Sequence, residues 1–168
     1  ANKDDLGRQK IYFVEFEDLF KKSDVQRSVK KNSLISNNFP DISIKIDKKF
    51  KYVGNFDFTI RDVARGERFV FVDARQGKVQ RLFIAQFEAI LPKSDEFYRY
   101  NFDTAQRFGK HKFRQNTFAY SNLEAKNENP NGEAALTEKF LKEKGFLLED
   151  ELMMSRFLVK MSWAIVFF

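Results

Sequence analysis

Strict alternation of apolar and polar residues predicts β-strands in the first half of the chain. Ile42, Ile44 and Ile46 alternate with polar residues, and over 50–61 an apolar or aromatic residue, or a glycine, takes every second position. A period of two places successive side chains on opposite faces of a sheet. The pattern predicts a strand that begins at residue 42 and a long strand over 50–61, with a bulge at Gly54.

The clearest element is an antiparallel hairpin over residues 68–90. The segment 68–74 is rich in Phe and Val, and the segment 79–90 returns as a second apolar strand. Gly77, in the short polar stretch between them, can adopt the positive φ that a tight turn needs. Apolar residues occupy both faces of this hairpin, so we expect its middle to be buried on both sides.

Helical spacing predicts one helix over about 132–144. Leu136 and Phe140 lie one turn apart on the same face. Asn131 suits the N-cap position, and Gly145 suits the residue that ends the helix. A turn-rich stretch from residue 127 to the start of this helix separates it from the strands before it.

A second helix is expected near the N-terminus, over 11–20. Phe13, Phe16 and Phe20 recur there at helical spacing, although the alternation in the same segment would also suit a strand. We expect residues 1–10 to be flexible, because they are polar and terminal. The other segments are predicted as follows: a surface connection over 23–41 with a short helix near 24–32, irregular chain over 93–112, a strand over 112–122 and a last strand over 153–168.

The order of these elements predicts an α+β fold in a single domain, residues 1–168. Strands joined as hairpins precede the helix, and no βαβ alternation appears. We expect one curved antiparallel β-sheet of about five to seven strands, packed by the helix at 132–144 and by the N-terminal helix. The alternative is a partly closed β-barrel.

The amino-acid composition limits the kinds of functional site that the chain can form. The chain has 168 residues, of which 43% are hydrophobic, so it can bury a core and is not intrinsically disordered. It has no Cys, which excludes disulfides, thiol catalysis and zinc-finger or iron–sulfur sites. The single His111 excludes any site that needs two histidines, and no phosphate-binding or metalloprotease motif is present. The sequence therefore predicts no metal, no cofactor and no catalytic residue.

The formal net charge of +6 is a weak indication of nucleic-acid binding. Basic residues are spread along the chain and interleaved with acidic ones. The octapeptide 65–72 lacks the RNA-binding RNP1 pattern, because Glu67 and Arg68 stand where an aromatic and a small residue are required. Nucleic acid is therefore an unlikely partner.

Polar side chains interrupt the Phe-rich strands, among them Gln86 and Glu88. A charge between large apolar neighbours must be paired or must face water or a ligand. Ion pairs across the sheet are the simpler interpretation. The functional hypothesis is a Phe-lined pocket between sheet and helix, in which arginines anchor an anionic group and tyrosines form the rim. The candidate ligand-binding residues are Arg61, Asp73, Arg81, Tyr98, Tyr100 and Arg156.

The function expected from these features is non-enzymatic binding of a small amphiphilic or anionic ligand. One alternative is a protein–protein interaction module that uses an exposed aromatic patch or a sheet edge. Another is an acid–base hydrolase or isomerase that uses Asp or Glu with Tyr, which would need a close pair of carboxylates in a cleft. Weak nucleic-acid binding is the last. The oligomeric state is not predicted.

The sequence leaves the cell compartment open. No apolar run approaches the roughly 18–20 residues of a transmembrane helix, so we expect a soluble protein with no transmembrane segment. The start at Ala1 suits an exported bacterial protein, periplasmic or secreted, after removal of a signal peptide, and it equally suits a cytoplasmic protein. The apolar end at Phe168 indicates that the last strand is buried or that the natural chain continues.

Overall fold

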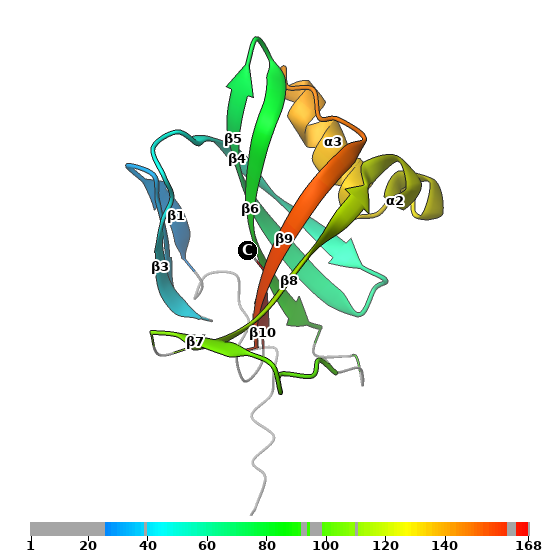
Figure 1. Cartoon of the computed structure of the whole chain (residues 1–168). Coiled ribbons are helices and arrows are strands. Elements are labelled where there is room, and N and C mark those ends of the chain that lie inside the picture. The colour runs from blue at the N-terminus through cyan, green and yellow to red at the C-terminus, as the bar shows by residue number, and fades with distance from the viewer. Residues whose placement is uncertain are drawn as a thin grey trace, which may run out of the picture.

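Two antiparallel sheets make up most of the protein (Figure 1). The computed structural model describes residues 26–38, 40–91, 94, 99–109, 111–160 and 164–167. The predicted N-terminal helix and the flexible residues 1–10 lie outside this range. The strands are β1 Arg27–Lys30, β2 Ser33–Asn37, β3 Asp41–Lys45, β4 Lys51–Ile60, β5 Ala64–Arg75, β6 Lys78–Ile90, β7 Gln106–Phe108, β8 His111–Ser121, β9 Glu151–Lys160 and β10 Ala164–Phe167, and the described helices are α2 Asn122–Glu128 and α3 Glu133–Glu143.

The small sheet has the strand order β1-β2-β3. Lys31 and Asn32 connect β1 to β2 with φ values of 47° and 58°, as tight hairpin turns require. The predicted surface connection over 23–41, with its short helix, is therefore wrong for the described residues. The turn carries no glycine in the sequence, and Asn32 takes the left-handed conformation that asparagine tolerates.

The large sheet has the order β4-β5-β6-β10-β9-β8-β7, and every neighbouring pair is antiparallel. The predicted hairpin is confirmed as β5 and β6, with Gln76 and Gly77 at φ values of 50° and 79° in the turn. The predicted bulge is also confirmed, because the register of β4 against β5 shifts between Tyr52 and Gly54. The predicted strand over 153–168 is in fact two strands, since β10 folds back and lies between β6 and β9.

The prediction of an α+β fold with one curved sheet is wrong. The fold is mostly β, because β1 to β3 separate from the rest as a sheet of their own and the two described helices have only 7 and 11 residues. The partly closed barrel formed from one sheet fails for the same reason. The predicted helix over 132–144 is confirmed as α3, but its N-cap is Gly132 and not Asn131. Helix α2 was not predicted.

Strand β5 contributes to two hydrophobic cores on opposite faces of the large sheet. Phe69 and Phe71 face the small sheet, where they pack with Leu34 of β2. Val70 and Val72 face the other way and pack with Leu141 of α3. Alternation along one strand therefore gives three layers: the small sheet, the large sheet and the helices. We call the two sides of the large sheet its small-sheet side and its helix side.

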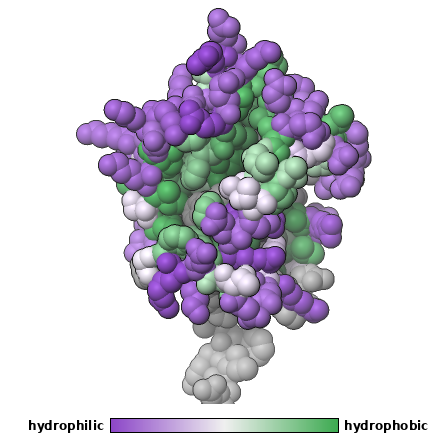
Figure 2. Space-filling view, viewed as in Figure 1, coloured by the Kyte–Doolittle hydropathy of each residue, from purple (hydrophilic) through white to green (hydrophobic). Residues whose placement is uncertain are grey.

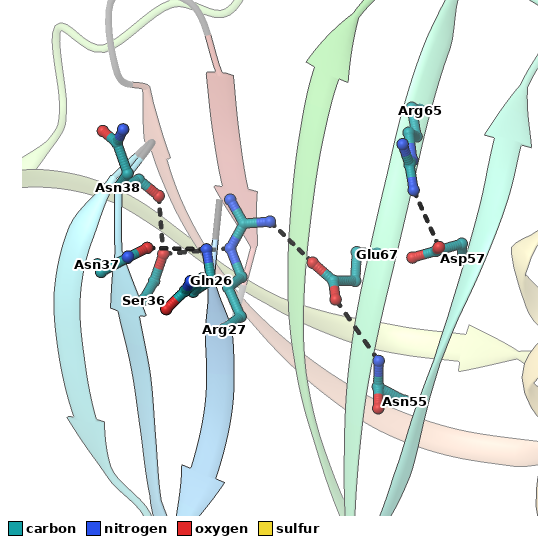
Figure 3. A network of polar contacts seen from close by, with 9 residues as sticks. All are labelled: Gln26, Arg27, Ser36, Asn37, Asn38, Asn55, Asp57, Arg65 and Glu67. Atoms are coloured by element: carbon teal, nitrogen blue, oxygen red, sulfur yellow. Dashed lines mark hydrogen bonds and ion pairs between the residues drawn. The ribbon is translucent and has the colours of Figure 1, made fainter. Parts of the chain in front are cut away.

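A polar contact also joins the two sheets. Arg27 of β1 donates to the carboxylate of Glu67 on β5 at 2.8 Å (Figure 3). The guanidinium of Arg27 also lies 4.1 Å from the ring centroid of Phe87. Its Nε also donates to the hydroxyl of the buried Ser36 on β2. Figure 2 shows hydrophobic residues gathered in the hollow between the two sheets, framed by hydrophilic residues. The small sheet is thus held by apolar packing and by a charged pair at its margin.

Candidate functional site

The helix side of the large sheet carries a buried arginine, Arg68. It lies on β5 directly opposite Gln86 of β6, and both side chains face α3. Its guanidinium forms an ion pair with Glu133 at 2.6 Å and donates to the hydroxyl of Thr137 at 2.5 Å. Burial lowers the pKa of Arg68, and the carboxylates of Glu133 and Glu88 oppose that shift. The guanidinium remains charged, because an arginine in a protein does not lose its proton near neutral pH.

Two carboxylates share one amide beside this arginine. The Nε2 group of Gln86 donates to Oε1 of Glu88 and, at 3.2 Å, to Oε1 of Glu133. Glu88 is only 6% exposed, whereas the side chain of Glu133 is 41% exposed. One carboxylate is therefore held inside the protein and the other at its surface, with an amide between them.

These carboxylates line an open groove of about 720 Å³, which we call the helix-side groove. Its walls come from the turn between β4 and β5, from β6 and β8, and from the ends of α2 and α3. The described lining residues include no Phe, so the expected Phe-lined pocket is not what this groove provides. They are Thr59, Ile60, Arg61, Asp62, Val63, Ala64, Glu88, Ile90, Tyr120, Ala125, Asn129, Asn131, Gly132, Glu133 and Ala134.

Two tyrosines lie near the carboxylates. Burial raises the pKa of Tyr120, which lines the groove, and Arg68 opposes that shift. Burial also raises the pKa of Tyr100, and the charge of Glu88 raises it further. Both phenols therefore stay protonated at neutral pH and can donate a hydrogen bond.

Three of the predicted ligand-binding residues lie on this side of the molecule. Arg61 lines the groove from the turn between β4 and β5, where its φ is 48°. Tyr100 interacts electrostatically with Glu88 and with Arg156. Arg156 of β9 donates to Asn116 on the neighbouring strand at 3.3 Å.

Two others form a separate pair. Arg81 and Asp73 lie opposite each other near the turn of the β5–β6 hairpin and form an ion pair at 2.8 Å. The side chain of Arg81 is 59% exposed, and neither residue lines the helix-side groove. For Arg81 and Asp73, the simpler interpretation given above therefore applies: the two charges form an ion pair across neighbouring strands. Tyr98 lies outside the described residues.

Sequence reasoning missed the centre of the site. The sequence pattern does not predict Arg68, Glu133 or Tyr120 as ligand-binding residues, and it marks Gln86 and Glu88 only as polar residues within apolar strands. Those two were the available signal, because a polar pair two residues apart in an otherwise apolar strand faces one side of a sheet together. What they meet on that side depends on where α3 packs, and that cannot be read from β6 alone.

The described residues contain no group of three or more His, Cys, Asp or Glu side chains that could hold a metal ion. No described helix is long and apolar enough to span a membrane. Comparison of the chain with protein-family models, with curated proteins and with solved structures gives no match.

Proposed function

We propose that the protein binds a small amphiphilic ligand in the helix-side groove. The ligand would carry a cationic or hydrogen-bond-donating group that meets Glu88, and an apolar part that lies along the groove wall. The observation that carries this proposal is the carboxylate of Glu88, 6% exposed, in the lining of a groove of about 720 Å³. Ligand pockets of this size commonly pair an apolar wall with a few placed polar groups.

The polar groups that line the groove favour a ligand that donates hydrogen bonds over a ligand that accepts them. Carboxylates of Glu88, Glu133 and Asp62 line it, against the single cation of Arg61 among the described lining residues. Arg68 lies behind the carboxylates and is already bonded to Glu133. An amine would gain charge-assisted hydrogen bonds from this set, whereas an anion would meet repulsion.

The apolar part of the ligand has a wall to contact. Ile60 at the end of β4 and Val63 in the turn that follows line the groove, and Ile90 lines it from β6. Covering such a surface gains about 25 cal/mol for each Å² removed from water. A short alkyl chain attached to an amine fits both halves of the site.

Titration with three eight-carbon probes tests the proposal: octylamine, octanol and octanoate. We expect octylamine to bind most tightly in isothermal calorimetry, and Glu88→Gln to weaken it about tenfold, which is the loss of one charged hydrogen bond. Glu149→Gln, a matched change at an exposed position, should leave the affinity unchanged. Equal binding of octanoate, or an unaltered affinity in Glu88→Gln, would reject the proposal.

Acid–base catalysis is a second candidate, favoured by one observation. Glu88 and Glu133 accept from the same amide group in an open groove that Tyr120 also lines. A buried and an exposed carboxylate in one cleft are the arrangement that can divide acid and base roles. Turnover of chromogenic esters or glycosides that is lost in Glu88→Gln and kept in Glu149→Gln would support this candidate. Rates equal to those of buffer alone would exclude these substrates.

A further inference from the structure

The open edge of the small sheet carries a second site, independent of the helix-side groove. Strand β3 pairs with β2 on one side, and no other described strand pairs with its second side. A groove of about 590 Å³ runs along this free edge, and we call it the edge groove. It is lined by Asp41, Ile42, Ser43, Ile44, Lys45, Phe108, Gly109, His111 and Phe113.

The backbone groups that face the edge groove follow from the pairing of β3. The N–H of Ile46 donates to Asn32 across the sheet at 2.8 Å, so residues of this parity bond to β2. In an antiparallel strand the N–H and C=O of one residue point to the same side, and the next residue points to the other. Ser43 and Lys45 therefore present their backbone donors and acceptors to the open edge.

The side chains around the edge groove divide by face. Ile42 and Ile44 face the core between the sheets, near Phe113. Phe108 lines the same groove and is 50% exposed, although it is a large aromatic residue. The groove thus has an apolar inner wall that is incompletely covered.

His111 provides a separate observation. It lines the edge groove, and its Nε2 is buried without a hydrogen-bond partner in the described part of the chain. Its ring stands edge-on to Phe113. A buried polar atom without a partner costs about 1–3 kcal/mol.

The outer face of the edge is charged. Lys45, Ser33 and Lys30 stand in one row across the small sheet, and Lys31 follows in the turn. Lys45 and Lys30 are exposed, so this end of β3 is basic. Asp41 lies at the opposite end of β3 and is also exposed. Directly opposed charges on neighbouring strands attract when their signs differ.

We propose that the edge groove binds an extended segment of another protein, which adds to β3 as a fourth, antiparallel strand. The segment carries an acidic residue opposite Lys45, apolar residues opposite Ile44 and Ile42, and a basic residue opposite Asp41. Strand addition of this kind takes its affinity from the backbone and its specificity from alternate side chains. The antiparallel direction matches the rest of the small sheet.

The probe is the blocked peptide Gly-Glu-Val-Thr-Val-Lys-Gly, titrated into the isotopically labelled full chain and followed by NMR. Its Thr lies opposite Ser43, so N-methylation of that Thr removes a bond to β3 and should weaken binding about tenfold. N-methylation of either Val, whose N–H points away from β3, should have little effect. Absence of any shift at millimolar peptide, or equal losses from all N-methyl groups, would overturn the proposal.

A matched pair of variants tests the same edge from the protein side. Ser43→Pro removes an N–H that β2 does not use and should abolish binding, whereas Ser43→Ala should keep it. Lys45→Glu should weaken binding about threefold and favour the peptide in which Glu is replaced by Lys, because that Lys then lies opposite the new carboxylate and the Lys opposite Asp41 is kept. If Ser43→Pro fails to fold, the series of N-methylated peptides still tests whether a strand adds to β3. The edge would be assigned to self-association instead by three results together. The molecular mass would double as the protein concentration rises, this doubling would be lost in Ser43→Pro, and the peptide would not bind.

Discussion

The guanidinium group of Arg68 on β5 donates to both the carboxylate and the backbone carbonyl of Glu133, the first residue of α3. One side chain thus fixes the start of a helix against the middle of a sheet. The N-cap of α3, Gly132, offers no side-chain hydrogen bond. The position of the helix depends instead on a residue 65 places earlier in the chain.

Arg68→Met should lower the free energy of unfolding by about 2–3 kcal/mol, since it removes several hydrogen bonds of a buried charge. Urea denaturation at neutral pH measures the loss. The matched control is Arg81→Met, which breaks the exposed pair with Asp73 and should cost less than about 1 kcal/mol. Equal losses in the two variants would contradict the anchoring role of Arg68.

Gly66→Ala should destabilise the protein by about 1–3 kcal/mol, because the added Cβ would lie 2.3 Å from Cζ of Phe58. Phe58 is 8% exposed and has little room to move. The cost should shrink in a Phe58→Leu background, where the aromatic ring is absent. Thermal unfolding of the two single variants and the double variant measures this coupling, and strict additivity would count against the steric explanation.

Leu34→Ala and Leu141→Ala should each lower the unfolding free energy by about 3 kcal/mol, the usual cost of truncating a buried leucine. Both residues are fully buried, but they pack against opposite faces of the large sheet. Their effects should therefore add in the double variant. Met153→Ala, at a residue that is 74% exposed, is the control and should cost less than about 0.5 kcal/mol.

Glu138→Gln should reduce stability at pH 7 and have little effect at strongly acidic pH. Hydrogen bonds from Lys126 and Lys142 lower the pKa of Glu138. A folded pKa below the unfolded value of about 4.3 gives stability above that value, and this stability is lost as the pH falls through the folded pKa. Urea titrations at several pH values measure the difference between wild type and variant. A difference that does not shrink below about pH 4 would contradict the charged pairing.

The local elements could be predicted where one signal dominated. Alternation and Gly77 were enough for the β5–β6 hairpin, and helical spacing with Gly145 was enough for α3. The small sheet could not be found in this way, because its first two strands are short and join through Lys31 and Asn32. Its stability comes from packing on the large sheet, which is a tertiary effect that overrides local preference.

The site was predicted less well than the elements, for a physical reason. A polar residue within an apolar strand shows that a partner must exist, but not which partner it is. Arg81 forms an ion pair with Asp73 on the adjacent strand, so its partner lies within the same hairpin. Arg68 forms an ion pair with Glu133 on a helix, and this pairing depends on how that helix packs on the sheet.

The place of β10 in the large sheet has a consequence for assembly. Strands β4 to β6 form one antiparallel group and β7 to β9 form another, and in the described sheet β10 alone joins them. It follows all the other described strands in the chain. As a nascent chain leaves the ribosome, both groups emerge before the strand that connects them. The sheet therefore becomes continuous only when β10 inserts between β6 and β9, and until then both strands present unpaired edges.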